Sequence, residues 1–279
     1  MKNNNEFSTV SQQLTGLFKR KFLFKIGFLL VIVLCHSVNL FSQERVSIAF
    51  SIGTSIPLPP FSQKDIDKTG AGFAKPGVLI DLKILKRIRK ERFDLGLAIR
   101  GNINGFNSKP ITETYEKNNP ATYDKWDRKV KGWTVISLMP GIIYNSSLNK
   151  KTQLNVGLNL GASYAQSQKF TLTGNSVNGP LSSNVVLIQK RSDAFALSTS
   201  LQTGFYFTLT SKMDLALSLD YFFLKPTFKN AESISYGTTS GPFPGGGTGI
   251  VSIFHRESRY NFVQNMNTLN LSCGVKLNL

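Results

Sequence analysis

Histidine and cysteine are nearly absent from this chain, which has two of each. This scarcity excludes the Cys and His clusters that hold structural zinc, so we expect no metal site and no cofactor. Cys35 lies in an N-terminal leader described below. The sequence therefore predicts that only Cys273 remains after processing and that no internal disulfide forms.

Acidic residues and long hydrophobic runs are also scarce. The chain has 33 Lys and Arg against 16 Asp and Glu, a formal net charge of +17, and only 18% of its residues are charged. No window contains the ~18 uninterrupted apolar residues of a membrane-spanning helix, so helical spans are not expected in the mature protein.

One shorter apolar run lies near the N-terminus. Basic residues in 19–25 precede the apolar segment 26–35, and a short polar segment, 37–43, follows it. This order is typical of a secretory signal peptide, which we predict over 1–42, leaving a mature domain over 43–279. A lipoprotein signal and a retained anchor helix are the alternatives. The bulky Leu34 disfavours the first, and the shortness of the segment disfavours the second.

Apolar residues alternate with small or polar ones along much of the mature chain. In residues 154–164, Leu, Val, Ala and Tyr occupy the even positions, and Asn, Gly and Ser occupy the odd ones. A period of two places the two sets on opposite faces of a strand. The pattern predicts eight strands, at 45–56, 76–85, 93–104, 133–145, 152–166, 194–209, 213–224 and 262–279.

The connections between these strands are alternately long and short. Short ones cover 86–92, 146–151 and 210–212, whereas long ones cover 57–75, 105–132, 167–193 and 225–261. In an up-and-down order all short connections lie at one end, as in transmembrane barrels. We therefore predict an all-β fold, an eight-stranded antiparallel up-and-down transmembrane β-barrel with short periplasmic turns and long extracellular loops.

Alternation alone does not say which face points outward. A soluble lipocalin-like carrier of apolar ligands also alternates, but with its apolar set inside. Here the other face is rich in Gly, Ser and Ala, as at Ser47, Ala49 and Ser51. Such a face has too little charge for a water-exposed exterior but suits a narrow lumen. The membrane barrel is favoured, with the soluble carrier as the alternative.

With these features the chain resembles the outer-membrane β-barrel proteins of Bacteroidota, in the broad OmpA/OmpX-like eight-stranded group. The resemblance rests on the leader ending Phe41-Ser42-Gln43-Glu44, on the strand pattern over 43–279 and on the segment 137–144. It implies a place in the cell outer membrane and contact with the barrel assembly machinery. The basic surplus then suits outer-membrane lipids and lipopolysaccharide, not nucleic acid. A monomer is expected, because a closed barrel has no free edges.

The lumen of the predicted barrel contains charged side chains. An eight-stranded barrel is just wide enough to be filled by side chains, and charges enclosed there must pair. We expect a polar plug, not a porin channel, with a gated proton or ion path as the alternative. By parity the plug contains Gln202 and a charged set, namely Asp81, Lys83, Asp94, Arg100, Asp214, Asp220 and Lys276.

Two connections carry candidate interaction residues. Tyr115, Tyr123 and Trp126 lie in the long connection 105–132, where exposed aromatics among Lys and Arg suit protein or glycan contacts. Trp133 either joins them or caps the barrel. Arg89, in the basic turn 86–92, suits an acidic periplasmic partner. The Gly-rich run 237–249 predicts a flexible loop.

Catalysis is not predicted. His255, beside Arg256, Glu257 and Ser258, is the only histidine after the leader, and no second member of a catalytic triad stands at a diagnostic spacing. The sequence predicts a non-enzymatic protein with a structural or surface-interaction role through its extracellular loops. An accessory component of a secretion or surface-assembly machine, acting through Arg89, is the alternative.

Overall fold

A computed structural model describes most of the compact unit Arg45–Leu279. The predicted signal peptide over 1–42 lies outside the described residues. None of the described helices is long and apolar enough to cross a membrane. The described ranges are 46–65, 70–88, 92–118, 125–176, 182–242 and 248–279.

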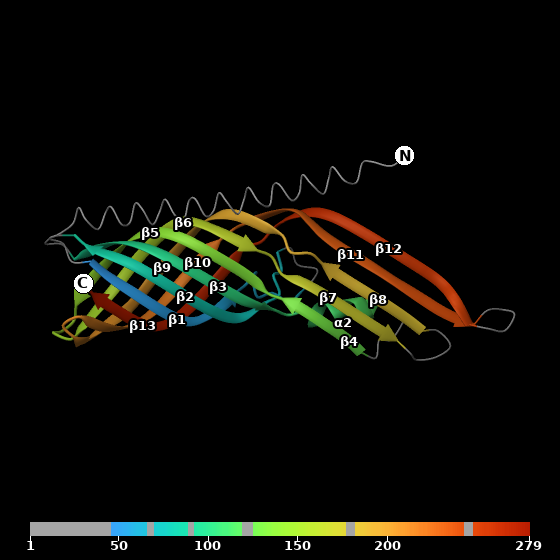
Figure 1. The fold of residues 1–279 in the computed structure, drawn as a ribbon, viewed down its shortest axis with the longest axis horizontal. Coiled ribbons are helices and arrows are strands. Elements are labelled where there is room, and N and C mark those ends of the chain that lie inside the picture. Colours follow the sequence, from blue (N-terminus) through green and yellow to red (C-terminus); the bar gives the residue numbers. More distant parts are fainter. Residues whose placement is uncertain (1–45, 66–69, 89–91, 119–124, 177–181, 243–247) are drawn as a thin grey trace. The chain divides into compact units, whose positions relative to one another are not determined.

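Eight strands form a closed antiparallel barrel in the order β1-β13-β10-β9-β6-β5-β3-β2 (Figure 1). Neighbours around the barrel are consecutive barrel strands along the chain, and β1 pairs with β13 to close it. The predicted up-and-down barrel is therefore confirmed, although the last strand begins at Met266 and not at 262. The strands are β1 (Val46–Leu58), β2 (Ala74–Arg87), β3 (Phe93–Phe106), β5 (Trp133–Ser147), β6 (Thr152–Gln166), β9 (Asp193–Thr210), β10 (Met213–Leu224) and β13 (Met266–Asn278).

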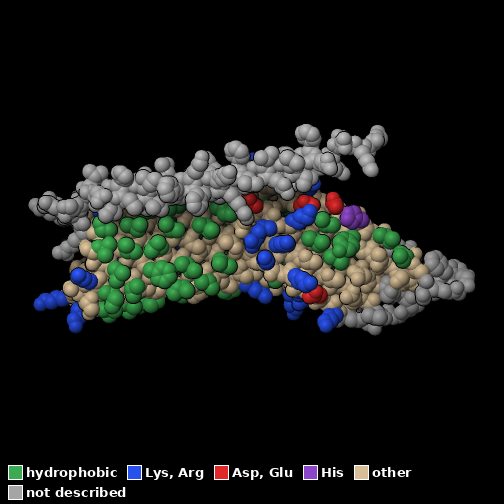
Figure 2. All heavy atoms as spheres, in the orientation of Figure 1, with side chains coloured by type: hydrophobic (Ala, Val, Ile, Leu, Met, Phe, Trp, Pro, Cys, Tyr) green, Lys and Arg blue, Asp and Glu red, His purple; other side chains and the backbone are tan. Residues whose placement is uncertain are grey.

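Most of the large apolar side chains of these strands point outward. Leu197 is 84% exposed, whereas its neighbours along β9 on the inward face are buried or half-buried. Figure 2 shows the resulting belt of hydrophobic side chains over the barrel. A soluble carrier would have the opposite arrangement, so the lipocalin-like alternative was wrong. Outward residues of the belt include Ile52, Ile80, Ile99, Ile136, Leu158, Phe195, Leu217 and Leu271.

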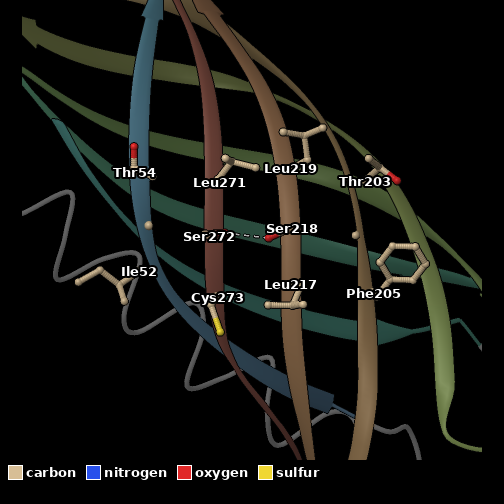
Figure 3. A pocket seen from close by; sticks show the side chains of 12 residues that line it. Ile52, Thr54, Thr203, Phe205, Leu217, Ser218, Leu219, Leu271, Ser272 and Cys273 are labelled. Carbon is tan, nitrogen blue, oxygen red and sulfur yellow. Dashed lines mark hydrogen bonds between the residues drawn. The ribbon is translucent and has the colours of Figure 1, made fainter. Parts of the chain in front are cut away.

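Glycine allows neighbouring strands to approach closely on one side of the barrel. A Cβ at Gly53 would lie 2.0 Å from the Leu271 carbonyl oxygen, and one at Gly204 would lie 2.2 Å from that of Leu217. A larger residue at either position would clash with main-chain atoms. The outer surface is hollowed here into an apolar groove of about 710 Å³, and the hydroxyls of Ser218 and Ser272 are 2.8 Å apart beside it (Figure 3).

Three of the four predicted long loops contribute strands to a second sheet. Its strand order is β12-β11-β8-β7-β4, and the helix α2 (Lys109–Asn118) precedes β4 in the chain. The Gly-rich run was predicted as a loop, and for the described residues of that run this was wrong. Residues 237–242 belong to β11 and 248–249 to β12, and only 243–247 lie outside the described residues. The strands of the second sheet are β4 (Lys125–Lys131), β7 (Lys169–Ser176), β8 (Ser182–Gln189), β11 (Thr227–Pro242) and β12 (Thr248–Val263).

The second sheet arises because barrel strands continue beyond the barrel. Only Lys225 and Pro226 separate β10 from β11, and only Gln264 and Asn265 separate β12 from β13. A strand that has paired over its whole length in the barrel thus leads directly into another pairing. Five barrel strands continue into the second sheet in this way, because β4 leads into β5, β6 into β7 and β8 into β9 after similarly short links.

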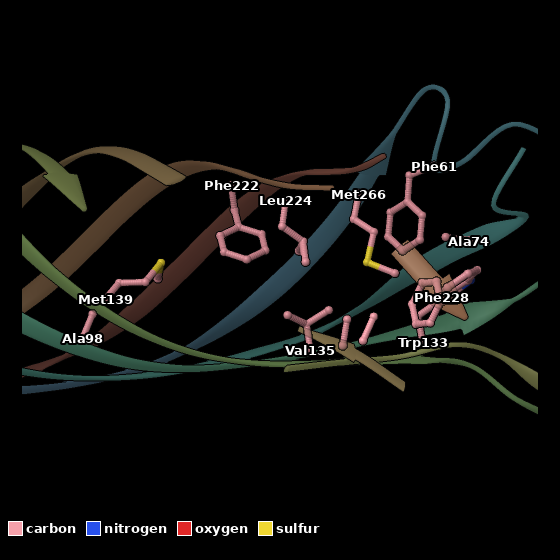
Figure 4. Packing of buried hydrophobic residues seen from close by; sticks show 12 residues of the cluster. Phe61, Ala74, Ala98, Trp133, Val135, Met139, Phe222, Leu224, Phe228 and Met266 are labelled. Atoms are coloured by element: carbon pink, nitrogen blue, oxygen red, sulfur yellow. The ribbon is translucent and has the colours of Figure 1, made fainter. Parts of the chain in front are cut away.

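A cluster of buried apolar side chains closes the barrel at the end where the second sheet begins (Figure 4). Trp133 is its centre, with ring centroids 5.5 Å from Phe61 and 5.9 Å from Phe228. The indole Nε1 of Trp133 donates a hydrogen bond of 3.0 Å to the Gly72 carbonyl. Trp133 therefore caps the barrel and does not belong to an exposed recognition surface.

Candidate functional site: the lumen and the second sheet

Arg100 stands at the centre of an ion-pair network that spans the lumen. Its side chain is 1% exposed, and its Nη2 and Nη1 lie 3.2 Å from an oxygen of Asp81 and 2.6 Å from one of Asp220. These acids come from β2 and β10, which are not neighbours in the barrel. Lys83 joins the network, with Nζ 3.0 Å from Asp81 and 2.7 Å from Gln202 Oε1. The strands are thereby tied together across the interior.

Asp220, on β10, accepts hydrogen bonds from several donors at once. Asp220 accepts hydrogen bonds from Asn270 at 2.9 Å and from the Ser200 hydroxyl, in addition to Arg100. Two carboxylates and two cations compensate one another here, so burial leaves no net charge. Buried ionic groups with this many partners favour one arrangement of the surrounding strands.

The remaining predicted lumen residues form a separate group at the short-turn end. Asp94 accepts hydrogen bonds from Arg87 and, at 2.8 Å, from Asn145. Asp214 accepts one of 3.1 Å from Asn278. The Lys276 ammonium lies 4.4 Å from the centroid of the Tyr206 ring. Arg87, Asp94, Asp214 and Lys276 all line a polar hollow of about 540 Å³. The structure thus divides the predicted set into two groups.

The inward side chains of β10 show how the lumen changes along its length. Asp214 lies at the short-turn end, Asp220 lies in the central network, and Phe222 and Leu224 follow at the far end. Phe222 and Leu224 belong to the same buried cluster as Trp133. In the described part of the chain, the lumen is therefore polar and hollow at one end and closed by apolar side chains at the other.

Two of the predicted interaction residues hold α2 on the second sheet. The Trp126 ring meets that of Tyr115 edge-on, with centroids 5.8 Å apart, and its Nε1 donates a 2.6 Å hydrogen bond to Glu116. Arg128 adds a 3.2 Å bond to the Thr112 hydroxyl. Tyr115 and Trp126 are half-buried and pack a helix, an arrangement that the sequence did not indicate. Tyr123 and Arg89 lie outside the described residues.

The two edge strands of the second sheet differ in character. In β4 five of seven residues are charged, a composition that discourages further strand pairing. β12 is longer and carries exposed apolar side chains, among them Ile250, Ile253 and Phe254. Within the described ranges β12 pairs on one side only, with β11. The sequence did not predict this edge, because the segment lacks a regular alternation.

His255 has no catalytic surroundings among the described residues. It lies on β12, with Nε2 3.3 Å from Glu257 Oε1 and its ring 6.3 Å from that of Tyr236. Both partners of the His–Glu contact are more than half exposed. No group of His, Cys, Asp and Glu side chains that could hold a metal ion occurs in the described ranges.

An outward apolar belt, a lumen with charged side chains and a closed strand order define a β-barrel of the transmembrane type. No family model and no curated protein matches the chain. Among solved structures it is similar to a major outer membrane protein from Thermus thermophilus, at 9% identity and a TM-score of 0.44, covering 85% of this chain and 100% of that one.

Two further solved structures are similar over comparable lengths. Neisserial surface protein A is 11% identical, with a TM-score of 0.40, covering 84% of this chain and 96% of that one. Ail, the attachment invasion locus protein of Yersinia pestis, is 12% identical with a TM-score of 0.35, covering 84% and 97%. The class of this chain rests on its own strand order and apolar belt.

Proposed function

We propose that this chain is a non-enzymatic protein of the outer membrane, in which the barrel is an anchor and the second sheet is a surface-interaction module. The observation that carries the proposal is the direct passage of β10 into β11 and of β12 into β13 at the closed end of the lumen. A barrel that is shut at this end is suited to holding a second sheet in place and not to transport.

The partner surface that we favour is the free edge of β12. An exposed edge strand offers unpaired main-chain donors and acceptors to an incoming strand, while neighbouring side chains select it. β12 has both, because Ile253 is 69% exposed on one face and Phe254 is exposed on the other. The charged edge of β4 offers no equivalent, so an extended segment of a surface protein would add to β12.

The test measures on which side of the outer membrane the second sheet lies. In a Cys273→Ser background, intact cells carrying Thr238→Cys or Lys150→Cys are treated with a membrane-impermeant maleimide. Thr238 is exposed on β11 in the second sheet, and Lys150 is exposed in the turn between β5 and β6, at the opposite end of the barrel from that sheet. Labelling of the first alone supports the proposal. Labelling of Lys150→Cys alone would reverse the orientation and contradict it.

A further inference from the structure

Three basic residues form an uncompensated cluster where the barrel meets the second sheet. Lys131 ends β4 and Lys169 begins β7, and these two residues stand directly opposite each other in the β4–β7 register. Directly opposed residues on antiparallel strands have Cβ atoms roughly 4.5–5.5 Å apart, and like charges at that spacing are destabilising. Both side chains are exposed, and neither has an ion pair with any described residue.

Arg191 adds a third positive charge beside this pair and is fixed in place. Its Nη2 donates to the carbonyl of Gly132, the residue after Lys131, at 3.1 Å. Its Nε donates to the Ser167 carbonyl at 3.2 Å and its Nη1 to Gln166 Oε1 at 3.0 Å. All of these acceptors are neutral. They hold Arg191 between the β4–β5 and β6–β7 links and do not neutralise its charge.

The nearby acids do not neutralise the basic cluster, defined as Lys131, Lys169 and Arg191. Glu232 forms a 2.6 Å ion pair with Lys190, and that hydrogen bond lowers the pKa of the Glu232 carboxyl. Asp193 stands opposite Gln166 at the start of β9 and is a single acid beside three bases. A surplus of positive charge therefore stays on the outside of the molecule at this level.

The basic cluster lies at the edge of the apolar belt. Lys131 lies just before the start of β5, Lys169 lies just after the end of β6, and Arg191 lies just before the start of β9. On the outward face of β9 the first apolar side chains are Phe195 and Leu197, both strongly exposed. Figure 2 shows Lys and Arg side chains gathered beside the hydrophobic belt. A lipid whose chains cover the belt would bring its headgroup to this level.

We propose that Lys131, Lys169 and Arg191 form a binding site for the phosphate of an anionic lipid headgroup. The inference rests on the proposed membrane location and adds a ligand class to it. Arg191, already oriented by main-chain carbonyls, would offer a fixed charge, and the two flexible lysines would close on the phosphate oxygens. The bound phosphate would also relieve the repulsion between the opposed lysines.

The test uses the full-length mature protein folded into vesicles of phosphatidylcholine, with or without a minority of phosphatidylglycerol. Lipids that stay bound after extraction are counted by native mass spectrometry. The variant is Lys131→Gln with Lys169→Gln, and its matched control is Lys117→Gln with Lys125→Gln, which removes two exposed lysines from the far end of β4 and from α2. We expect about a tenfold loss of preference for phosphatidylglycerol in the first variant only.

Each other outcome overturns the proposal. An unchanged preference, or an equal loss in the control, would mean that the cluster is not the site. Displacement of the lipid by inorganic phosphate at equal concentration would assign the site to a soluble anion. A protein that does not enter vesicles, seen as no change in gel mobility on boiling, would contradict the membrane location itself, which is a different result from lost lipid preference.

Discussion

At the scale of single residues, Arg100 carries the largest consequence. Replacing it by Leu would leave Asp81 and Asp220 buried with one fewer cation each. Breaking one side of a buried ion pair costs about 3–5 kcal/mol of unfolding free energy. We expect Arg100→Leu to lower the unfolding free energy of the barrel in micelles by this amount. The measurement is a denaturant titration, in which the unfolding midpoint of the variant should be lower.

The matched control for Arg100 is an exposed pair. Lys129 and Asp127 lie 4.0 Å apart, and their side chains are 81% and 65% exposed. Lys129→Leu should change the unfolding free energy by less than about 1 kcal/mol, since exposed pairs contribute little. An equally small effect of both substitutions would mean that the lumen network does not hold the barrel together.

Cys273 reports directly on the surroundings of the outer face. Its free thiol is exposed and lines the apolar groove on the outside of the barrel. In native outer membranes we expect labelling by a lipid-soluble maleimide and none by a charged one, because hydrocarbon excludes the charged reagent. Thr238→Cys in the second sheet serves as the positive control for the charged reagent. Equal labelling of Cys273 by both reagents would place this face in water.

At the scale of secondary-structure elements, the attachment of α2 depends on Trp126. Trp126→Phe would keep the aromatic contact with Tyr115 and remove the hydrogen bond to Glu116. A bond of this kind to a charged group contributes about 1.5–3 kcal/mol, and partial exposure places this one at the low end. We expect faster amide exchange in α2 and an unchanged gel shift of the barrel. Loss of the gel shift would show that the helix supports the barrel as well.

The barrel strands were predictable from sequence and the second sheet was not. In β6 the alternation of Leu and Val with Asn and Gly reflects two different solvents, lipid and lumen, on its two faces. β4 and β12 lack this contrast. Most side chains along β4 and many along β12 are exposed, whether they stand at odd or at even positions of the strand. The partner of β4 is also distant, because β4 pairs with β7 and the barrel strands β5 and β6 lie between them in the sequence.

The candidate sites were predictable to different degrees. Parity alone placed Asp81, Arg100 and Asp220 on the inward face, where they are found buried. It could not show that Asp94 and Lys276 belong to a separate group, because that depends on the stagger between strands. The opposition of Lys131 and Lys169 requires the β4–β7 register, which no local pattern contains.

At the scale of the whole molecule, the closed lumen predicts the absence of a conducting pore. Phe222, Leu224 and Trp133 are each no more than 1% exposed at one end, and Arg100 occupies the middle. The purified protein in planar bilayers should therefore show no stable channel, even under an applied voltage. A trimeric porin reconstituted in the same bilayers is the positive control. Stepwise conductance from the purified protein would contradict the closed lumen.

The short passage from β12 into β13 also determines how the molecule would respond to force. Tension on β12 reaches β13 after Gln264 and Asn265, and β13 is paired along its length with β1 and with β10. A pull along the strand axis loads both hydrogen-bond ladders in shear, so that many bonds share the load instead of breaking one after another. Under mechanical stress the attachment of the second sheet would thus be as strong as the barrel seam itself.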